Sequence, residues 1–161
     1  ASAVSYSPHR RRGPRRAEVT AMTIPIPASH LDLLTRPIIA VLTTLMPDGQ
    51  PQSSLMWCDF DGQCARINTT AERQKGRNMR ADPRVTLLIV DPGDTSRYIE
   101  IRGRVELTQE GAIPHLDELT RQYTEHPRFY GYVYPVEQEA QETRLMGRIV
   151  AMKITLDAIH R

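Results

Sequence analysis

The residues best suited to binding chemistry lie in one stretch of the chain, from Asn68 to Ile89. Two hydroxyl side chains come first and four cations follow: Thr69, Thr70, Arg73, Lys75, Arg77 and Arg80. Backbone N–H groups at a helix start, together with hydroxyls and cations, favour a bound phosphate. The alternative interpretation is a solvated basic helix between two strands.

The same stretch predicts a short helix between two strands. Thr69 is its expected N-cap, and Glu72 is the expected N3 partner of a capping box. The helix ends at Asp82, because the residue before Pro83 is disfavoured in the helical region. The β-branched and apolar run that follows predicts a buried strand over 83–90.

The rest of the chain indicates a mainly β domain. Apolar or alternating stretches predict six strands, over 38–45, 51–60, 63–68, 83–90, 98–107 and 148–155. Besides the basic helix, helices are expected over 29–35 and 110–125. Mostly antiparallel strands with three inserted helices suggest a closed or nearly closed β-barrel, since closure removes exposed sheet edges.

Two local features refine this prediction. Gly103, inside the strand 98–107, predicts a β-bulge or a close backbone approach. The aromatic segment 129–135 is interpreted as a loop packed on the barrel or on a partner subunit, in preference to a substrate-stacking element.

Charge is spread unevenly along the chain. The formal net charge is +2, yet residues 9–16 alone hold five arginines. We expect residues 1–21 to be a disordered basic tail and 22–161 to be the folded domain. A nucleic-acid-binding arm is the less favoured reading of the tail, because no aromatic or helical pattern accompanies its charges. No apolar run approaches the ~18 residues of a membrane span, so a cytoplasmic protein is expected.

Residues with the spacing of known catalytic motifs are missing. The chain has no nucleophile elbow, phosphate-binding P-loop or glycine-rich dinucleotide fingerprint. Its histidines are dispersed, so no metal site is expected, and His115 is interpreted as structural. Asp59 and Asp61 flank a hairpin turn, where Asp is common for backbone reasons. No catalytic side chain is therefore predicted, and any enzyme activity must come from a bound cofactor.

The chain offers the parts that such a cofactor needs. The predicted phosphate anchor is Thr69, Thr70, Arg73, Lys75 and Arg77. Gln52 and Ser54 share one face of a strand and provide polar groups. Trp57 is a candidate apolar wall, with a core tryptophan as the alternative.

The residue pattern resembles the flavin/deazaflavin oxidoreductases that share the split β-barrel of pyridoxamine 5′-phosphate oxidase, in particular the branch that uses coenzyme F420. The resemblance covers roughly residues 29–157. Its most specific part is the run Lys75-x-x-Asn78-x-x-x-Asp82-Pro83-Arg84 after a strand that ends in Thr. The other matching segments are 39–44, 48–52, Trp57, Asp61-Gly62, 73–85, 98–105 and 148–155.

The resemblance implies a six-stranded antiparallel split β-barrel of the FMN-binding type. It also implies a homodimer with two cofactor sites at the subunit interface. By analogy, Arg73, Lys75 and Asn78 hold the cofactor phosphate. The polyglutamate tail of F420 would favour exposed cations, and Arg77, Arg80 and Arg84 are available for it. Beside the ring and its side chain the analogy places Gln52, Ser54, Asn68, Thr69 and Thr70. The partner subunit would close the site with the loop near Ser96-Arg97 and the segment 129–134.

The function that the resemblance implies is hydride transfer between F420 and a small unsaturated substrate. The alternatives are an FMN-binding oxidoreductase of the same fold and a cofactor-binding protein without turnover. The Asp82-Pro83-Arg84 pattern and the short chain favour F420 over FMN. The chain lacks the Arg-x-His C-terminal signature of pyridoxamine phosphate oxidases, so vitamin B6 oxidation is not expected. It also lacks a clear segment for haem ligation of the kind seen in haem-degrading relatives.

Overall fold

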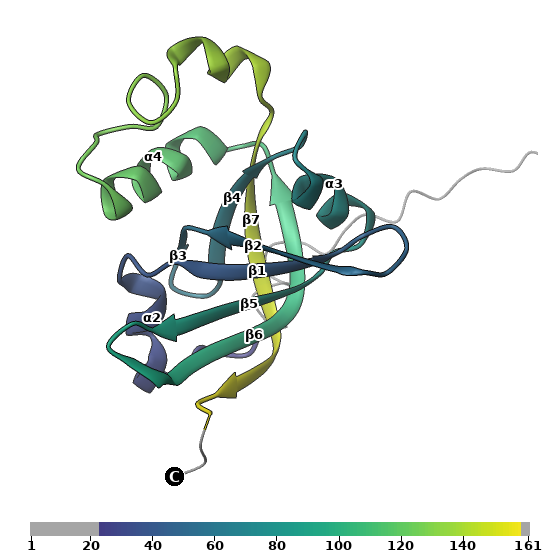
Figure 1. The fold of residues 1–161 in the computed structure, drawn as a ribbon, viewed down its shortest axis with the longest axis vertical. Helices are drawn as coiled ribbons and strands as arrows, with labels where there is room; N and C mark the ends of the chain where they lie inside the picture. Colours follow the sequence, from purple (N-terminus) through teal and green to yellow (C-terminus); the bar gives the residue numbers. More distant parts are fainter. Residues whose placement is uncertain (1–22, 159–161) are drawn as a thin grey trace, which may run out of the picture.

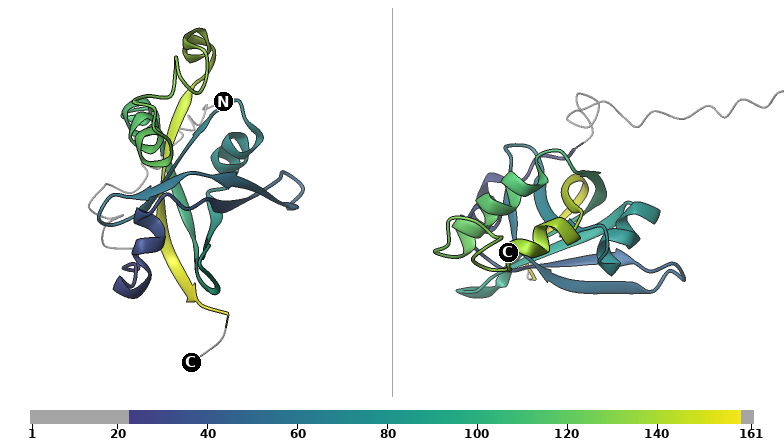
Figure 2. Two further views of the ribbon diagram at one scale, coloured as in Figure 1. Left: turned by 60° about the vertical axis from the view of Figure 1, so that its left-hand side comes forward. Right: turned by 90° about the horizontal axis from the view of Figure 1, so that it is seen from above.

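Seven antiparallel strands form a single curled sheet in this computed structural model, which describes residues 23–158. The order of the strands across the sheet is β2-β1-β5-β6-β7-β4-β3. Figures 1 and 2 show the sheet curled on itself, with helices around it. The strands are β1 (Ala40–Leu45), β2 (Pro51–Met56), β3 (Cys58–Phe60), β4 (Ala65–Thr70), β5 (Arg84–Asp91), β6 (Asp94–Thr108) and β7 (Arg144–Leu156).

The predicted strand 51–60 is in fact two strands, which is why the sheet has seven strands and not six. β2 pairs with β1 at one end of the sheet, and β3 pairs with β4 at the other end. The chain crosses between the two ends at Trp57. The Tyr123 hydroxyl lies at this crossing, where it accepts from the Cys58 N–H (3.1 Å) and donates to the Ile38 carbonyl (2.7 Å). The mainly β, antiparallel split-barrel prediction is confirmed, with this corrected strand count.

The core fills the inside of the curled sheet. Side chains alternate along each strand, and buried residues accordingly alternate with partly exposed ones along β1 and through the middle of β5. Leu33 and Leu34 of α2 (Asp32–Thr35) pack into the same cluster. The fully buried strand residues include Leu42, Ile67, Leu87, Ile89, Ile99, Ile101 and Ile149.

The helices lie at the ends and sides of the sheet (Figure 1). The predicted helix 29–35 is divided into a 3₁₀ turn and a short helix, η1 (Ala28–His30) and α2. The predicted amphipathic helix 110–125 is confirmed as α4 (Ala112–Tyr123). The remaining helices are α3 (Gln74–Ala81) and η2 (Val136–Gln141).

The predicted start of the basic helix is wrong. Thr69 lies inside β4 and is not an N-cap, and α3 begins only at Gln74 with Arg73 in the N-cap position. Strand pairing prevails here, because Thr69 is opposite Leu145 of β7. The Glu72 carboxylate accepts from the Thr143 N–H (3.1 Å) instead of closing a capping box.

The predicted end of the helix is correct. Asp82 follows the last helical residue and has extended backbone angles (φ −139°, ψ 112°), as expected before Pro83.

Gly103 makes the close backbone approach that its position predicts. The register between β6 and β7 shifts at Arg102/Gly103, and a Cβ on Gly103 would lie 2.0 Å from the Val150 carbonyl oxygen. Only a residue without a Cβ fits this close contact. The register shift that it permits lets the long strands β6 and β7 bend together around the core.

The tail predicted for residues 1–21 lies outside the described residues. Within 23–158, no helix combines the length and apolar character that crossing a membrane requires.

Gly76 fixes α3 against the end of β4. A Cβ at this position would lie 2.0 Å from the Thr70 carbonyl oxygen and 3.3 Å from the Ala71 Cα. Both contacts are with backbone, so the helix cannot approach β4 this closely with any other residue. This contact sets where the side chains at the start of α3 project.

We expect Gly76→Ala to destabilise the fold by about 1–3 kcal/mol, because the added methyl group must displace α3 from β4. Thermal unfolding should show a fall in Tm of several degrees. Gly93→Ala is the matched control, since a Cβ there meets only the Asp91 Oδ1 at 3.4 Å. Equal Tm values for the two variants would contradict the close contact.

Candidate functional site

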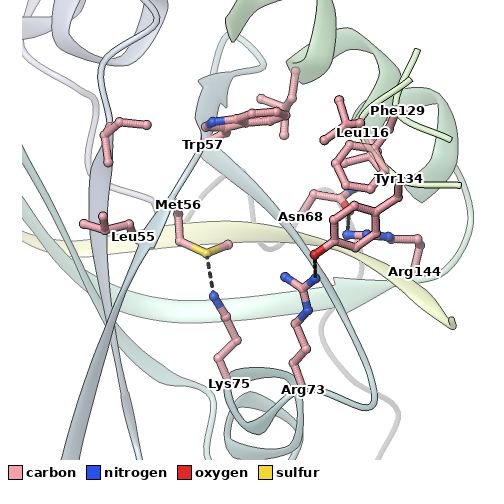
Figure 3. Close-up of a pocket in the computed structure, with 13 residues that line it drawn as sticks. Leu55, Met56, Trp57, Asn68, Arg73, Lys75, Leu116, Phe129, Tyr134 and Arg144 are labelled. Atoms are coloured by element: carbon pink, nitrogen blue, oxygen red, sulfur yellow. Dashed lines mark hydrogen bonds between the residues drawn. The ribbon is translucent and has the colours of Figure 1, made fainter. Parts of the chain in front are cut away.

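A pocket of about 270 Å³ opens where the β2–β3 crossing, the start of α3 and α4 come together (Figure 3). Its volume is close to the lower end of the ~300–1,000 Å³ typical of ligand pockets. Its wall combines apolar and aromatic side chains with three cations. The lining residues are Ile39, Leu55, Met56, Trp57, Asn68, Arg73, Lys75, Leu116, Leu119, Phe129, Val133, Tyr134 and Arg144.

Two of the cations have no counter-ion among the described residues. The Lys75 ammonium lies 3.2 Å from the Met56 thioether sulfur, which is a weak acceptor. Arg73 donates from Nη2 to the Tyr134 hydroxyl at 3.0 Å. Figure 3 shows both side chains rising from the start of α3 into the pocket. Two adjacent positive charges without a carboxylate favour the binding of an anion.

The electrostatics of Lys75 support this interpretation. Burial lowers the pKa of Lys75 below its ordinary value, and the positive charge of Arg73 lowers it further. Both causes disfavour the charged ammonium in the ligand-free protein. A bound anion would remove part of this penalty, since it would supply the missing opposite charge.

Trp57 forms the apolar wall and also packs the crossing between β2 and β3. Its ring stacks on Tyr123 (centroids 5.3 Å apart, planes 16° apart) and meets the edge of Phe129 at 6.4 Å. The side chain is half-buried and lines the pocket. Trp57 therefore lines the pocket and at the same time packs against the aromatic cluster around Phe129.

Arg144 is a pocket residue that the sequence did not reveal. Its side chain is only 4% exposed, and it donates to the Tyr130 hydroxyl (2.8 Å) and to the Glu142 carboxylate (2.9 Å). Its guanidinium also lies over the Phe129 ring at 4.8 Å. Unlike Arg73 and Lys75, this cation is neutralised and held in place. The only sequence signal was an arginine directly after an acidic and aromatic region.

Asn68 joins the pocket to a buried polar network. Its amide nitrogen donates to the Ala112 carbonyl (2.8 Å) and lies 3.2 Å from His115 Nδ1. His115 Nε2 lies 3.1 Å from the Asp59 carboxylate, which also accepts two hydrogen bonds from Arg66. Burial alone would raise the pKa of Asp59, but the hydrogen bonds from His115 and Arg66 outweigh it and lower that pKa.

Of the predicted site residues, the pocket wall contains Trp57, Asn68, Arg73 and Lys75. The predicted polar pair on β2, Gln52 and Ser54, lies outside the wall, as do Thr69 and Thr70 of β4. Within residues 23–158, the buried oxygens Gln52 Oε1 and Thr69 Oγ1 have no hydrogen-bond partner. Thr70 instead supports the anchor, because its hydroxyl accepts from the Arg73 N–H at 3.2 Å.

Arg77 and Asn78 lie on α3 but do not line the pocket. Arg77 donates to the Glu72 carbonyl and to Gln74 Oε1, and it thereby holds the turn into the helix. Asn78 is buried and donates to the Thr44 hydroxyl at 3.0 Å. In this structure both residues position the helix that carries the anchor.

The aromatic segment 129–134 lines the pocket of its own chain. Phe129, Val133 and Tyr134 line the wall, and Tyr134 contacts Arg73 directly. Arg97, expected to reach a partner's site, pairs with Asp32 (2.5 Å) and Asp91 (2.8 Å) of its own chain. Across 23–158, no group of three or more His, Cys, Asp or Glu side chains is arranged to hold a metal ion.

Comparison with known proteins agrees with this architecture. The family model described as pyridoxamine 5′-phosphate oxidase matches residues 26–160. A solved structure named F420 reductase is 30% identical, with a TM-score of 0.69 over 81% of this chain and 98% of that one.

Two further structures have the same fold. A conserved hypothetical protein from Mycobacterium tuberculosis is 27% identical, with a TM-score of 0.65 over 85% of this chain and 87% of its own. A putative pyridoxamine 5′-phosphate oxidase from Listeria innocua is 23% identical, with a TM-score of 0.58 over 80% of this chain and 94% of that one.

We expect Lys75→Met to stabilise the ligand-free protein at pH 7. The pKa of Lys75 is lower in the folded than in the unfolded chain, so its charge opposes folding wherever both states are protonated. Removing that charge should raise Tm by roughly 1–3 °C, since partial exposure screens the effect.

The gain should shrink as the pH rises from the lowered pKa of Lys75 to about 10.5, where the unfolded lysine also loses its proton. Differential scanning fluorimetry between pH 7 and pH 10.5 measures this. Arg80→Met, an exposed cation on the same helix, should show no such gain. A lower Tm for Lys75→Met at pH 7 would count against the uncompensated charge.

Proposed function

Because the chain belongs to the pyridoxamine 5′-phosphate oxidase family, we propose that it is an oxidoreductase that binds coenzyme F420 and reduces a small unsaturated substrate. The similarity to a structure named F420 reductase supports the choice of cofactor. The observation that carries the proposal is the pair of uncompensated cations, Arg73 and Lys75, beside an aromatic and apolar wall.

The residues of the pocket fit a phosphorylated ring cofactor. Arg73 and Lys75 supply charge for the phosphate, because neither is neutralised by a carboxylate of residues 23–158. Trp57, Leu116 and Phe129 supply the apolar surface that holds a flat ring and excludes water. The charged end and the apolar end of the pocket thus match the two parts of such a molecule.

When bound, the deazaflavin supplies two-electron hydride transfer. The protein then needs no nucleophile of its own, and its residues act by binding, orientation and exclusion of water. FMN bound at the same anchor is the second candidate, since the two cations would hold any phosphorylated ring. A cofactor-binding protein without turnover is the third.

The exposed apolar residues beside the pocket favour a homodimer as the working form. Leu55 is 70% exposed and Ile39 46% exposed, and both line the pocket. Exposed apolar side chains at the edge of a site favour cover by another protein surface.

We expect Leu55→Glu to convert a dimer into monomers and to weaken cofactor binding, and sedimentation velocity measures the first effect. A wild-type monomer at micromolar concentration would contradict the dimer.

Titration of the purified protein with F420 and with FMN tests the choice of cofactor. Trp57 is the only tryptophan of the chain and lies in the pocket wall, so quenching of its fluorescence reports binding directly. We expect F420 to bind more tightly than FMN. Lys75→Ala should weaken F420 binding at least tenfold, or about 1.4 kcal/mol, through loss of one charge-assisted contact.

Arg104→Ala is the matched control for this titration, because Arg104 is an exposed cation of β6 outside the pocket wall. It should bind F420 like the wild type. Oxidation of reduced F420 on addition of unsaturated substrates then separates an enzyme from a carrier. Unchanged F420 affinity in Lys75→Ala would exclude the anchor, and tighter binding of FMN would favour the flavin alternative.

A further inference from the structure

The side-chain amide of Asn68 is held in one orientation. Its nitrogen donates one hydrogen to the Ala112 carbonyl at 2.8 Å, and its second hydrogen faces His115 Nδ1 at 3.2 Å. Both N–H groups are therefore used inside the protein. The amide oxygen is left on the pocket side of Asn68.

The Ala112 carbonyl makes this orientation definite. It can only accept, so the Asn68 atom 2.8 Å from it is the amide nitrogen. The same nitrogen faces His115 Nδ1, which therefore accepts through its lone pair, and His115 Nε2 carries the hydrogen toward the Asp59 carboxylate at 3.1 Å. A lone pair at Nδ1 accepts from the Asn68 nitrogen and would repel the Asn68 oxygen.

Arg144 places a donor next to the Asn68 oxygen. Its Nη1 donates to Asn68 Oδ1 at 3.5 Å, a long hydrogen bond that leaves a second hydrogen on Nη1 and a second lone pair on the oxygen. The guanidinium is fixed by Glu142, Tyr130 and Phe129. An acceptor and a donor thus lie side by side in the pocket wall, in a part of the pocket where the charge is neutralised.

We propose that Asn68 Oδ1 and Arg144 Nη1 form a recognition edge for the paired N–H and C=O groups of a lactam or imide ring, and that His115 and Asp59 are positioning residues for that edge. The inference rests on the proposed function, because the ring of a deazaflavin or flavin carries such an imide. It assigns the ring end of the cofactor to the side of the pocket formed by β4, β7 and α4. The phosphate end lies at Arg73 and Lys75.

The test uses a ligand without phosphate, so that the edge and the anchor are measured separately. The wild-type protein is titrated with F420, with the deazaflavin riboside that lacks the phosphate, and with the riboside methylated on its imide nitrogen. Methylation removes the imide N–H, which would donate a hydrogen bond to the Asn68 oxygen. We expect it to weaken binding about tenfold, and to have no further effect in Asn68→Leu.

Two variants of His115 distinguish positioning from packing. In His115→Asn, the amide oxygen can take the place of Nδ1 and still accept from Asn68. In His115→Gln, the longer side chain reaches the place of Nε2 and contacts Asp59 instead. We expect His115→Asn to keep the riboside affinity within about twofold, and His115→Gln to lose as much as Asn68→Leu. A purely structural role predicts that both lose affinity in proportion to their fall in Tm.

Each outcome assigns the failure to one part of the site. Equal affinity of the wild type for the riboside and its methylated form overturns the edge and leaves the anchor intact. Riboside binding as tight as F420 binding overturns the anchor and leaves the edge. Lys75→Ala should weaken the binding of F420 but not of the riboside. Loss of riboside binding in that variant would therefore contradict the separation of the phosphate anchor from the recognition edge. No binding of any of the three ligands overturns both proposals.

Discussion

A half-buried ammonium group without a counter-ion is the constraint on which the site depends. Lys75 has a thioether as its nearest acceptor, and Arg73 beside it adds a second positive charge. A charge held in this way costs stability, since it has lost water without gaining a carboxylate. The arrangement is reasonable if the protein works with an anion bound there. The rest of the pocket extends from these two cations towards an apolar wall and the polar groups of Asn68 and Arg144.

The barrel brings these parts together from segments that are distant in sequence. The close contact of Gly76 with Thr70 sets α3 against β4, so Arg73 and Lys75 project towards the crossing between β2 and β3. That crossing exposes Trp57 to the pocket because the two ends of the curled sheet meet there. The polar edge comes from β4 and β7, strands that pair directly.

The sequence was informative where the signal is local. Arg73 and Lys75 stand at the start of a helix that follows a strand and ends before Pro83, so their place beside each other in one pocket could be predicted. Thr69 was misread as a cap because the pairing of β4 with β7 cannot be seen in the local pattern. The break at Trp57 was missed for a similar reason. The alternation of side chains continues through it, while the crossing is fixed by hydrogen bonds from Tyr123, which lies 65 residues after Cys58. Arg144 approaches Asn68 across 76 residues, and no local pattern predicts such a contact.

The pKa of Lys75 in the free and in the F420-bound protein is the most direct test of this account. It can be measured by NMR titration of the Lys75 side chain, assigned with Lys75→Met. The account predicts a pKa below the ordinary lysine value of 10.5 in the free protein, and a higher pKa when F420 is bound. A pKa that F420 leaves unchanged, in a protein that binds it, would contradict the claim that Lys75 holds the phosphate.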